Sequence, residues 1–182
     1  PMYTVAAHVM NKRMDSMNMV TVDIPIDPVR DYLKEKRREG TPLSHLAVVI
    51  AAYLRTAAEF PELNRFISNC KPYARREFSV AMVVLKSGKM DNGTMSKMYF
   101  EMGQTVFDVN RVINEYVQKN KNTPEKNGTE RMIKILLSLP GLLRFGVGLF
   151  RFMDKHGLLP YSVIRMSPFH SSLAISDLAS IR

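Results

Sequence analysis

FPELNRFISNCKPYARREFSVAMVV, residues 60–84, contains both the end of a helix and the start of a sheet. Pro61 cannot continue an α-helix, because it lacks an amide proton and its ring crowds the preceding turn. From Phe78 onward, apolar residues dominate the run FSVAMVVLK, which is typical of a buried strand. The stretch therefore predicts a helix that stops near residue 60 and a strand over 78–86.

The residues before this stretch predict one strand and two helices. Alternating apolar residues in MVTVDIPIDP, residues 19–28, predict a half-buried strand over 20–26. A short amphipathic helix should follow, with Asp27 as its N-cap and Gly40 at its end. Thr41-Pro42 repeats the start signal. The run 46–60 is apolar around most of its circumference, which predicts a central helix covered on several sides and too interrupted to span a bilayer.

The residues after this stretch continue the mixture of strands and helices. GTMSKMYFE, residues 93–101, predicts a second strand after the turn residues Asp91-Asn92-Gly93. Helical spacing predicts a helix over 105–117, and KNKNTPEKNG, residues 119–128, predicts a loop. Further predicted elements are two short helices within 129–157, separated at Pro140-Gly141 and ended by Gly157, and strands at the opening segment, at 161–166 and at 173–178.

Strands and helices alternate without regular βαβ units, so the predicted class is α+β. We expect a two-layer sandwich in which a mixed β-sheet carries helices on one face. The 182 residues, 46% of them hydrophobic, suit a single domain over 1–182.

The net charge of +9 favours anionic partners such as nucleotide phosphates or lipid headgroups. Cys70 is the only cysteine, so no intramolecular disulfide can form, which fits a cytoplasmic location. A secretory signal is not expected, because the first residues lack a long apolar run after a basic region. The methionines lack histidine or cysteine at useful spacing, so no metal site is predicted.

The order of these elements resembles the chloramphenicol acetyltransferase-like superfamily, which includes the acyltransferase (E2) catalytic domain of 2-oxoacid dehydrogenase complexes. Residues 60–84 are the most specific part, because that family places a proline-terminated helix, a short strand and a longer strand in this order. LAISDLASI, residues 173–181, resembles the acyltransferases' strand in which serine precedes a polar residue, leucine and a small residue. The resemblance covers about 18–120 and 166–182, and the region between departs from it.

The resemblance implies coenzyme A or acyl-coenzyme A as ligand and a homotrimer with active sites between subunits. A small-molecule or lipoyl-type acceptor would receive the acyl group from the thioester. The family's general base is a histidine in an H-x-x-x-D-G motif, and its serine, which maps to Ser176, stabilises the oxyanion. None of the four histidines here has Asp four positions later, so the general base is not present in this chain. We therefore expect an acyltransferase-like domain that is incomplete at its C-terminus and inactive in this form.

Other candidate residues have simpler interpretations. His170 lies near three serines, but alternation along a strand separates neighbouring side chains, so a structural role is expected. A capping role is expected for His156, a polar position at the helix edge for His45, and a turn for Asn64-Arg65. Cys70 as a nucleophile would need a base and an electropositive pocket, and an ordinary packing role is the simpler interpretation.

Two alternatives to acyl transfer remain open from the sequence. A non-enzymatic oligomeric scaffold or binding module would explain the missing motif. The basic and apolar region 131–155 could lie on an anionic membrane surface, although packing on the body or across a subunit interface is the preferred interpretation. No nucleic-acid partner is expected, because no aromatic residues are interleaved with the charges in a recognisable motif.

Overall fold

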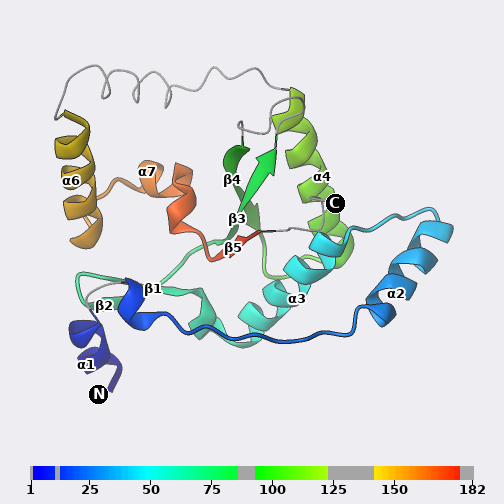
Figure 1. Cartoon of the computed structure of the whole chain (residues 1–182), viewed down its shortest axis with the longest axis horizontal. Coiled ribbons are helices and arrows are strands. Elements are labelled where there is room, and N and C mark those ends of the chain that lie inside the picture. The colour runs from blue at the N-terminus through cyan, green and yellow to red at the C-terminus, as the bar shows by residue number, and fades with distance from the viewer. Residues whose placement is uncertain (1, 11–12, 86–92, 123–141, 177–182) are drawn as a thin grey trace.

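The computed structural model describes residues 2–10, 13–85, 93–122 and 142–176 (Figure 1). Its helices are α1 (Met2–Val9), α2 (Asp27–Arg38), α3 (His45–Glu59), α4 (Val106–Asn122), α6 (Leu142–Lys155) and α7 (Tyr161–Met166). Its strands are β1 (Arg65–Ser68), β2 (Lys71–Ala74), β3 (Phe78–Leu85), β4 (Gly93–Phe100) and β5 (Leu173–Ile175). Single 3-10 turns form η1 (Arg13–Ser16), η2 (Pro61–Asn64) and η3 (Pro168–His170).

The main sheet is mixed, with strand order β4-β3-β5. β3 and β4 pair antiparallel from Phe78↔Phe100 to Leu85↔Gly93, and β5 pairs parallel to β3 from Val80↔Leu173 to Met82↔Ile175. β1 and β2 form a separate antiparallel hairpin. The predicted α+β class and mixed sheet are confirmed.

The core lies between one face of the main sheet and helices α3 and α4 (Figure 1). Phe78 and Val80 of β3 and Met98 of β4 are fully buried there. Ile50 and Leu54 of α3 meet them, together with Val109 of α4. The opposite face of β4 contacts the α7–η3 segment through Lys97 and Tyr99. The expectation of helices on one face therefore holds for the core layer only.

Helix α3 begins later than the Thr41-Pro42 signal predicts. Ser44 is its N-cap, and the Ser44 hydroxyl accepts a hydrogen bond from the amide of Ala47. Asn110 of α4 is buried beside it. Its amide oxygen accepts from Ser44 N and Oγ, both at 3.1 Å, and its Nδ2 donates to Pro42 O. The Asn110 side chain therefore provides hydrogen-bond partners for the backbone at the start of α3, and it joins α3 to α4. Val49 is exposed, so α3 is not covered on several sides as predicted.

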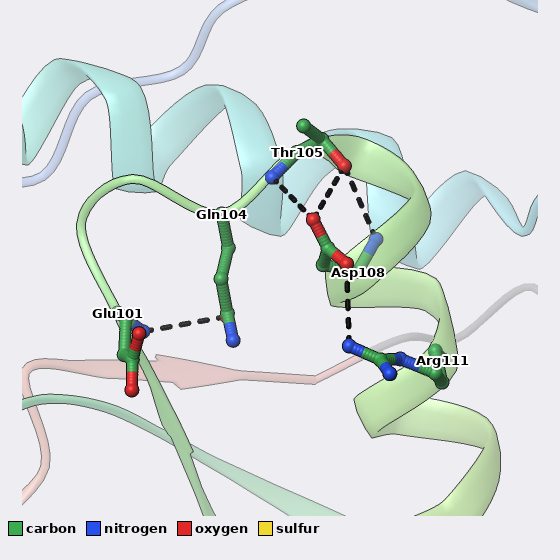
Figure 2. A network of polar contacts seen from close by, with 5 residues as sticks. All are labelled: Glu101, Gln104, Thr105, Asp108 and Arg111. Atoms are coloured by element: carbon green, nitrogen blue, oxygen red, sulfur yellow. Dashed lines mark hydrogen bonds and ion pairs between the residues drawn. The ribbon is translucent and has the colours of Figure 1, made fainter.

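The start of α4 is fixed by a reciprocal cap, shown in Figure 2. Asp108 Oδ2 accepts from Thr105 N and Oγ1, and Thr105 Oγ1 accepts from Asp108 N. Arg111 donates to the other carboxylate oxygen, Oδ1. These hydrogen bonds satisfy amides that have no partner within a helix. Helix α4 runs to Asn122, so 119–122 are helical and the predicted loop begins later.

Three predicted strands are wrong. The opening segment is helix α1, and the predicted strand at 161–166 is helix α7. Residues 20–26 form no strand, although Val20, Val22 and Ile24 alternate as predicted, and all three are exposed. A strand requires a partner, and none of the described residues pairs with this segment.

Turn and helix ends mostly follow the sequence. Gly40 and Gly157 both have positive φ and end α2 and α6 as predicted. Ile26, rather than Asp27, is the N-cap of α2. The β1–β2 turn places Asn69 and Cys70 at φ 48° and 57°, a left-handed conformation that is uncommon for residues other than glycine. The predicted turn at 91–92 and the first predicted helix after 129 lie outside the described residues.

Candidate functional site

Two adjoining cavities lie on the side of the main sheet opposite α3 and α4. Cavity A, of about 300 Å³, lies between the β3–β4 hairpin and α7, and its lining includes Arg76, Glu77, Lys97, Tyr99, Tyr161 and Arg165. Cavity B, of about 370 Å³, lies between the β1–β2 hairpin and the end of α6, and its lining includes Ser68, Tyr73, Asp154, Gly157 and Phe169. Phe66, Arg75, Ile164 and His170 line both. The two cavities therefore share part of their wall, to which the α7–η3 segment contributes Ile164 and His170.

The Lys97 ammonium holds this segment against the sheet. It donates to the backbone oxygens of Ile164 at 3.1 Å, Ser167 at 3.3 Å and His170 at 3.0 Å. Burial lowers the pKa of Lys97, and the neighbouring positive charge of Arg75 lowers it further. Arg75 also donates to His170 O, at 2.9 Å, and its guanidinium lies over the Phe66 ring. Two cations therefore bind one turn of backbone.

Cations and aromatic rings face each other across cavity A. The Arg165 guanidinium lies 5.2 Å from the Tyr99 ring centre and 3.7 Å from Glu77, and Tyr161 donates to the same carboxylate at 3.0 Å. Tyr99 donates to Arg165 O. Burial raises the pKa of Tyr99, and the Glu77 charge adds to this effect, so the phenol stays protonated at neutral pH. Among the described residues, Glu77 is the one acidic residue that lines cavity A, together with four lysine and arginine residues.

His170 and Asp154 form an ion-pair contact at the wall of cavity B. His170 Nε2 lies 3.1 Å from Asp154 Oδ1, and 15% of the histidine side chain is exposed. His156, for which a capping role is expected, packs its ring against Phe152. Ser172 does not form a Ser/His site, because its hydroxyl accepts from Ser79 N. The structure supports a structural role for His170.

Ser176 directly follows β5 and is exposed. The strand register pairs Ala174 with Ala81, and Ala81 with Lys97, so these residues share one row across the sheet. Leu173 and Ile175 pack against the core. Alternation of side chains along an extended chain assigns Ser176 to the opposite side, that of Lys97, roughly 7 Å beyond the Lys97 row in the direction of Val83, and Ser176 lines neither cavity.

The remaining candidates lie apart from both cavities or have structural roles. His45 is exposed at the first turn of α3. Cys70 is half-buried in the β1–β2 turn. Asn64 is buried, its backbone oxygen accepts from Arg75 N, and its Oδ1 has no hydrogen-bond partner among the described residues. The sequence interpretation missed Arg75, Lys97 and Tyr99, because their spacing carries no motif.

Comparison with protein-family models, with curated proteins and with solved structures gave no match. In the described part of the chain, no group of three histidine, cysteine or acidic side chains is placed to hold a metal ion. Among the same residues, no helix has the length and apolar content needed to cross a membrane. The site must therefore be interpreted from its own geometry.

Proposed function

We propose that this chain is a coenzyme A-dependent acyltransferase-like domain in which cavity A holds the phosphate-bearing part of acyl-coenzyme A. The observation that carries the proposal is the gathering of Arg76, Arg165, Tyr99 and Tyr161 around cavity A, on the face of the sheet to which side-chain alternation assigns Ser176. The order of helix α3, strand β1 and strand β3 also supports the sequence resemblance.

The lining of cavity A has the chemistry that a phosphorylated nucleotide requires. Arg76 is exposed and Arg165 lies at the same cavity, so two guanidinium groups can bind phosphate oxygens in bidentate fashion. Tyr99 and Tyr161 provide rings for stacking. The volume of about 300 Å³ lies at the lower end of ligand sites, so the remainder of a molecule as long as coenzyme A would extend beyond cavity A.

In acyl transfer, the acceptor hydroxyl or thiol loses a proton as it attacks the thioester carbonyl. The carbonyl oxygen becomes an oxyanion, and the coenzyme A thiolate leaves when the carbonyl re-forms. In this proposal the Ser176 hydroxyl donates a hydrogen bond to that oxyanion. The proton acceptor is not assigned to any residue of this chain, so we propose ligand binding without turnover in this form.

A non-catalytic binding module is the second candidate, favoured by the absence of H-x-x-x-D-G from the sequence. It uses the same cavity and differs only in never completing the reaction.

A homotrimer is part of the first proposal, and sedimentation equilibrium of the purified chain tests it: a trimer supports the acyltransferase arrangement, whereas a monomer counts against a site between subunits.

Calorimetric titration with coenzyme A and with pantetheine, which lacks the nucleotide, tests the proposal. We expect coenzyme A to bind more tightly, and Arg76→Ala with Arg165→Ala to abolish that preference. Arg37→Ala with Arg38→Ala on the exposed side of α2 is the matched control and should leave it unchanged. Equal binding of both ligands, or none, would contradict the proposal.

Acyl-thioester cleavage separates the two candidates. Release of free coenzyme A from acetyl-coenzyme A, measured with a thiol reagent, should be absent for this chain. A chain extended by a segment with H-x-x-x-D-G should release it, and Ser176→Ala should slow that release about 100-fold without weakening binding. An extended chain that binds but releases nothing would support the binding module.

A further inference from the structure

Helix α6 presents an apolar side to solvent. Phe145, Leu149 and Phe152 recur at i, i+4 and i+7 and therefore lie on one side of the helix, and their exposed fractions are 70%, 49% and 57%. In Figure 1, α6 lies at one side of the molecule, away from α3 and α4. Of the two preferred sequence interpretations, packing on the body or across a subunit interface, packing on the body does not hold for these three side chains.

A neighbouring side of α6, about 100° around the helix from these apolar residues, is basic. Arg144, Arg151 and Lys155 lie at i, i+7 and i+11, and all three are exposed. The acidic residue of the helix, Asp154, is engaged by His170 at 3.1 Å. An apolar side flanked by cations is the arrangement of helices that lie in the plane of a membrane interface.

The last two residues of α6 fasten the helix to the body. Asn69 N donates to Lys155 O at 2.9 Å, and Ser68 Oγ donates to Asp154 O at 3.4 Å. Leu149 precedes the attached residue Asp154 by about one and a half helical turns, and Phe145 precedes it by about two and a half turns. A flat surface can therefore approach the helix without disturbing the β1–β2 hairpin.

We propose that α6 docks onto an anionic phospholipid surface. Charge complementarity selects this occupant. A second copy of the chain would bring another net charge of +9 and another basic α6 to the contact, whereas anionic headgroups neutralise Arg144 and Arg151 while the acyl region receives the phenylalanines. This docking is independent of ligand binding in cavity A.

Vesicle flotation tests the proposal with the full chain. We expect the protein to float with vesicles of phosphatidylcholine mixed with phosphatidylserine, less at high salt, and not with phosphatidylcholine alone. Arg144→Glu with Arg151→Glu should weaken binding at least about tenfold. Arg37→Glu with Arg38→Glu on α2 lowers the net charge equally and should change it by less than about threefold, because α2 does not carry the apolar side.

A Phe145→Ser, Phe152→Ser variant provides a second measurement, with circular dichroism to verify folding. Loss of flotation with unchanged oligomeric state supports docking on lipid. Three outcomes would overturn the proposal: no flotation of the unaltered chain, equal losses in the α6 and α2 charge variants, or an oligomer that dissociates in the serine variant while flotation persists.

Discussion

Replacing Lys97 by methionine removes the cation that holds the α7–η3 segment to the sheet. Two of its three hydrogen bonds, to Ile164 O and His170 O, are 3.1 and 3.0 Å long, and the third, to Ser167 O, is 3.3 Å. The 3.3 Å bond is longer than the usual range and is not counted. Hydrogen bonds to charged groups contribute about 1.5–3 kcal/mol each, so the two shorter bonds set an upper limit of about 3–6 kcal/mol.

Two effects reduce that limit. The ammonium is partly desolvated in the folded state, which the lowered pKa of Lys97 reflects, and methionine recovers that cost. The side chain is also partly exposed, so solvent screens its charge. We expect Lys97→Met to lower the free energy of unfolding by about 2 kcal/mol, measured by urea denaturation.

Lys34→Met is the matched control, because Lys34 bonds Asp31 on the exposed surface of α2. It should cost about 0.5 kcal/mol or less. The pH dependence gives an independent check. The folded pKa of Lys97 lies below its ordinary value, so the unfolded chain binds more protons between the two, and stability rises with pH across that window. Equal effects of the two substitutions, or the same alkaline rise in Lys97→Met, would refute this account.

Three further substitutions test the helix starts and the β1–β2 turn. Asn110→Ala should lower the free energy of unfolding by about 2 kcal/mol in urea, because it leaves the Ser44 amide without its partner; a change below about 0.5 kcal/mol would contradict this role. Thr105→Ala should lower the melting temperature by about 2–4 °C. Thr105 lowers the pKa of Asp108, so this stabilisation is present above the ordinary carboxyl pKa and is lost as pH falls through the lower folded value; an effect that persists in acid would contradict it. Cys70→Gly should stabilise the chain by about 0.5 kcal/mol in urea, because glycine adopts φ 57° without strain, and destabilisation would show that the thiol packs usefully.

Local signals predicted the elements whose formation depends on their own residues. Pro61 ends α3, Gly40 and Gly157 end their helices, and the apolar run from Phe78 forms β3. The buried residues of α3 and β3 then assemble into the core. The β3–β4 pair of the main sheet was predictable for the same reason, since these two strands are adjacent in the sequence.

The wrong predictions fall where distant residues decide the structure. YSVIRM, residues 161–166, has strand-like composition, yet it forms a helical turn whose backbone oxygens Ile164 O and Arg165 O accept hydrogen bonds from Lys97 and Tyr99. The alternation in 20–26 shows that this segment suits a sheet, but a pattern cannot supply a neighbouring strand.

The cavities were not predictable from spacing. His170 and Asp154 are brought together by the turn after α6 and by η3, and no periodicity relates them. In the sequence, Lys97 is an ordinary polar position of a predicted strand. Its role in holding the α7–η3 segment depends on backbone carbonyl groups within 164–170, far away in the sequence. Ser176 was identified by resemblance, and its oxyanion role remains a prediction.

The β1–β2 turn holds α6 at its C-terminal end only, among the contacts described above, so a rotation at that end moves the N-terminal end of the helix the most. Its 14 residues extend about 21 Å from the pivot formed by Asn69 N and Lys155 O. A rotation of about 10° at that pivot displaces the far end by roughly 4 Å, while Asp154 at the near end stays beside His170. A small change in the twist of the β1–β2 hairpin is thereby converted into a displacement of several ångström at the far end of the helix, with little disturbance of the wall of cavity B.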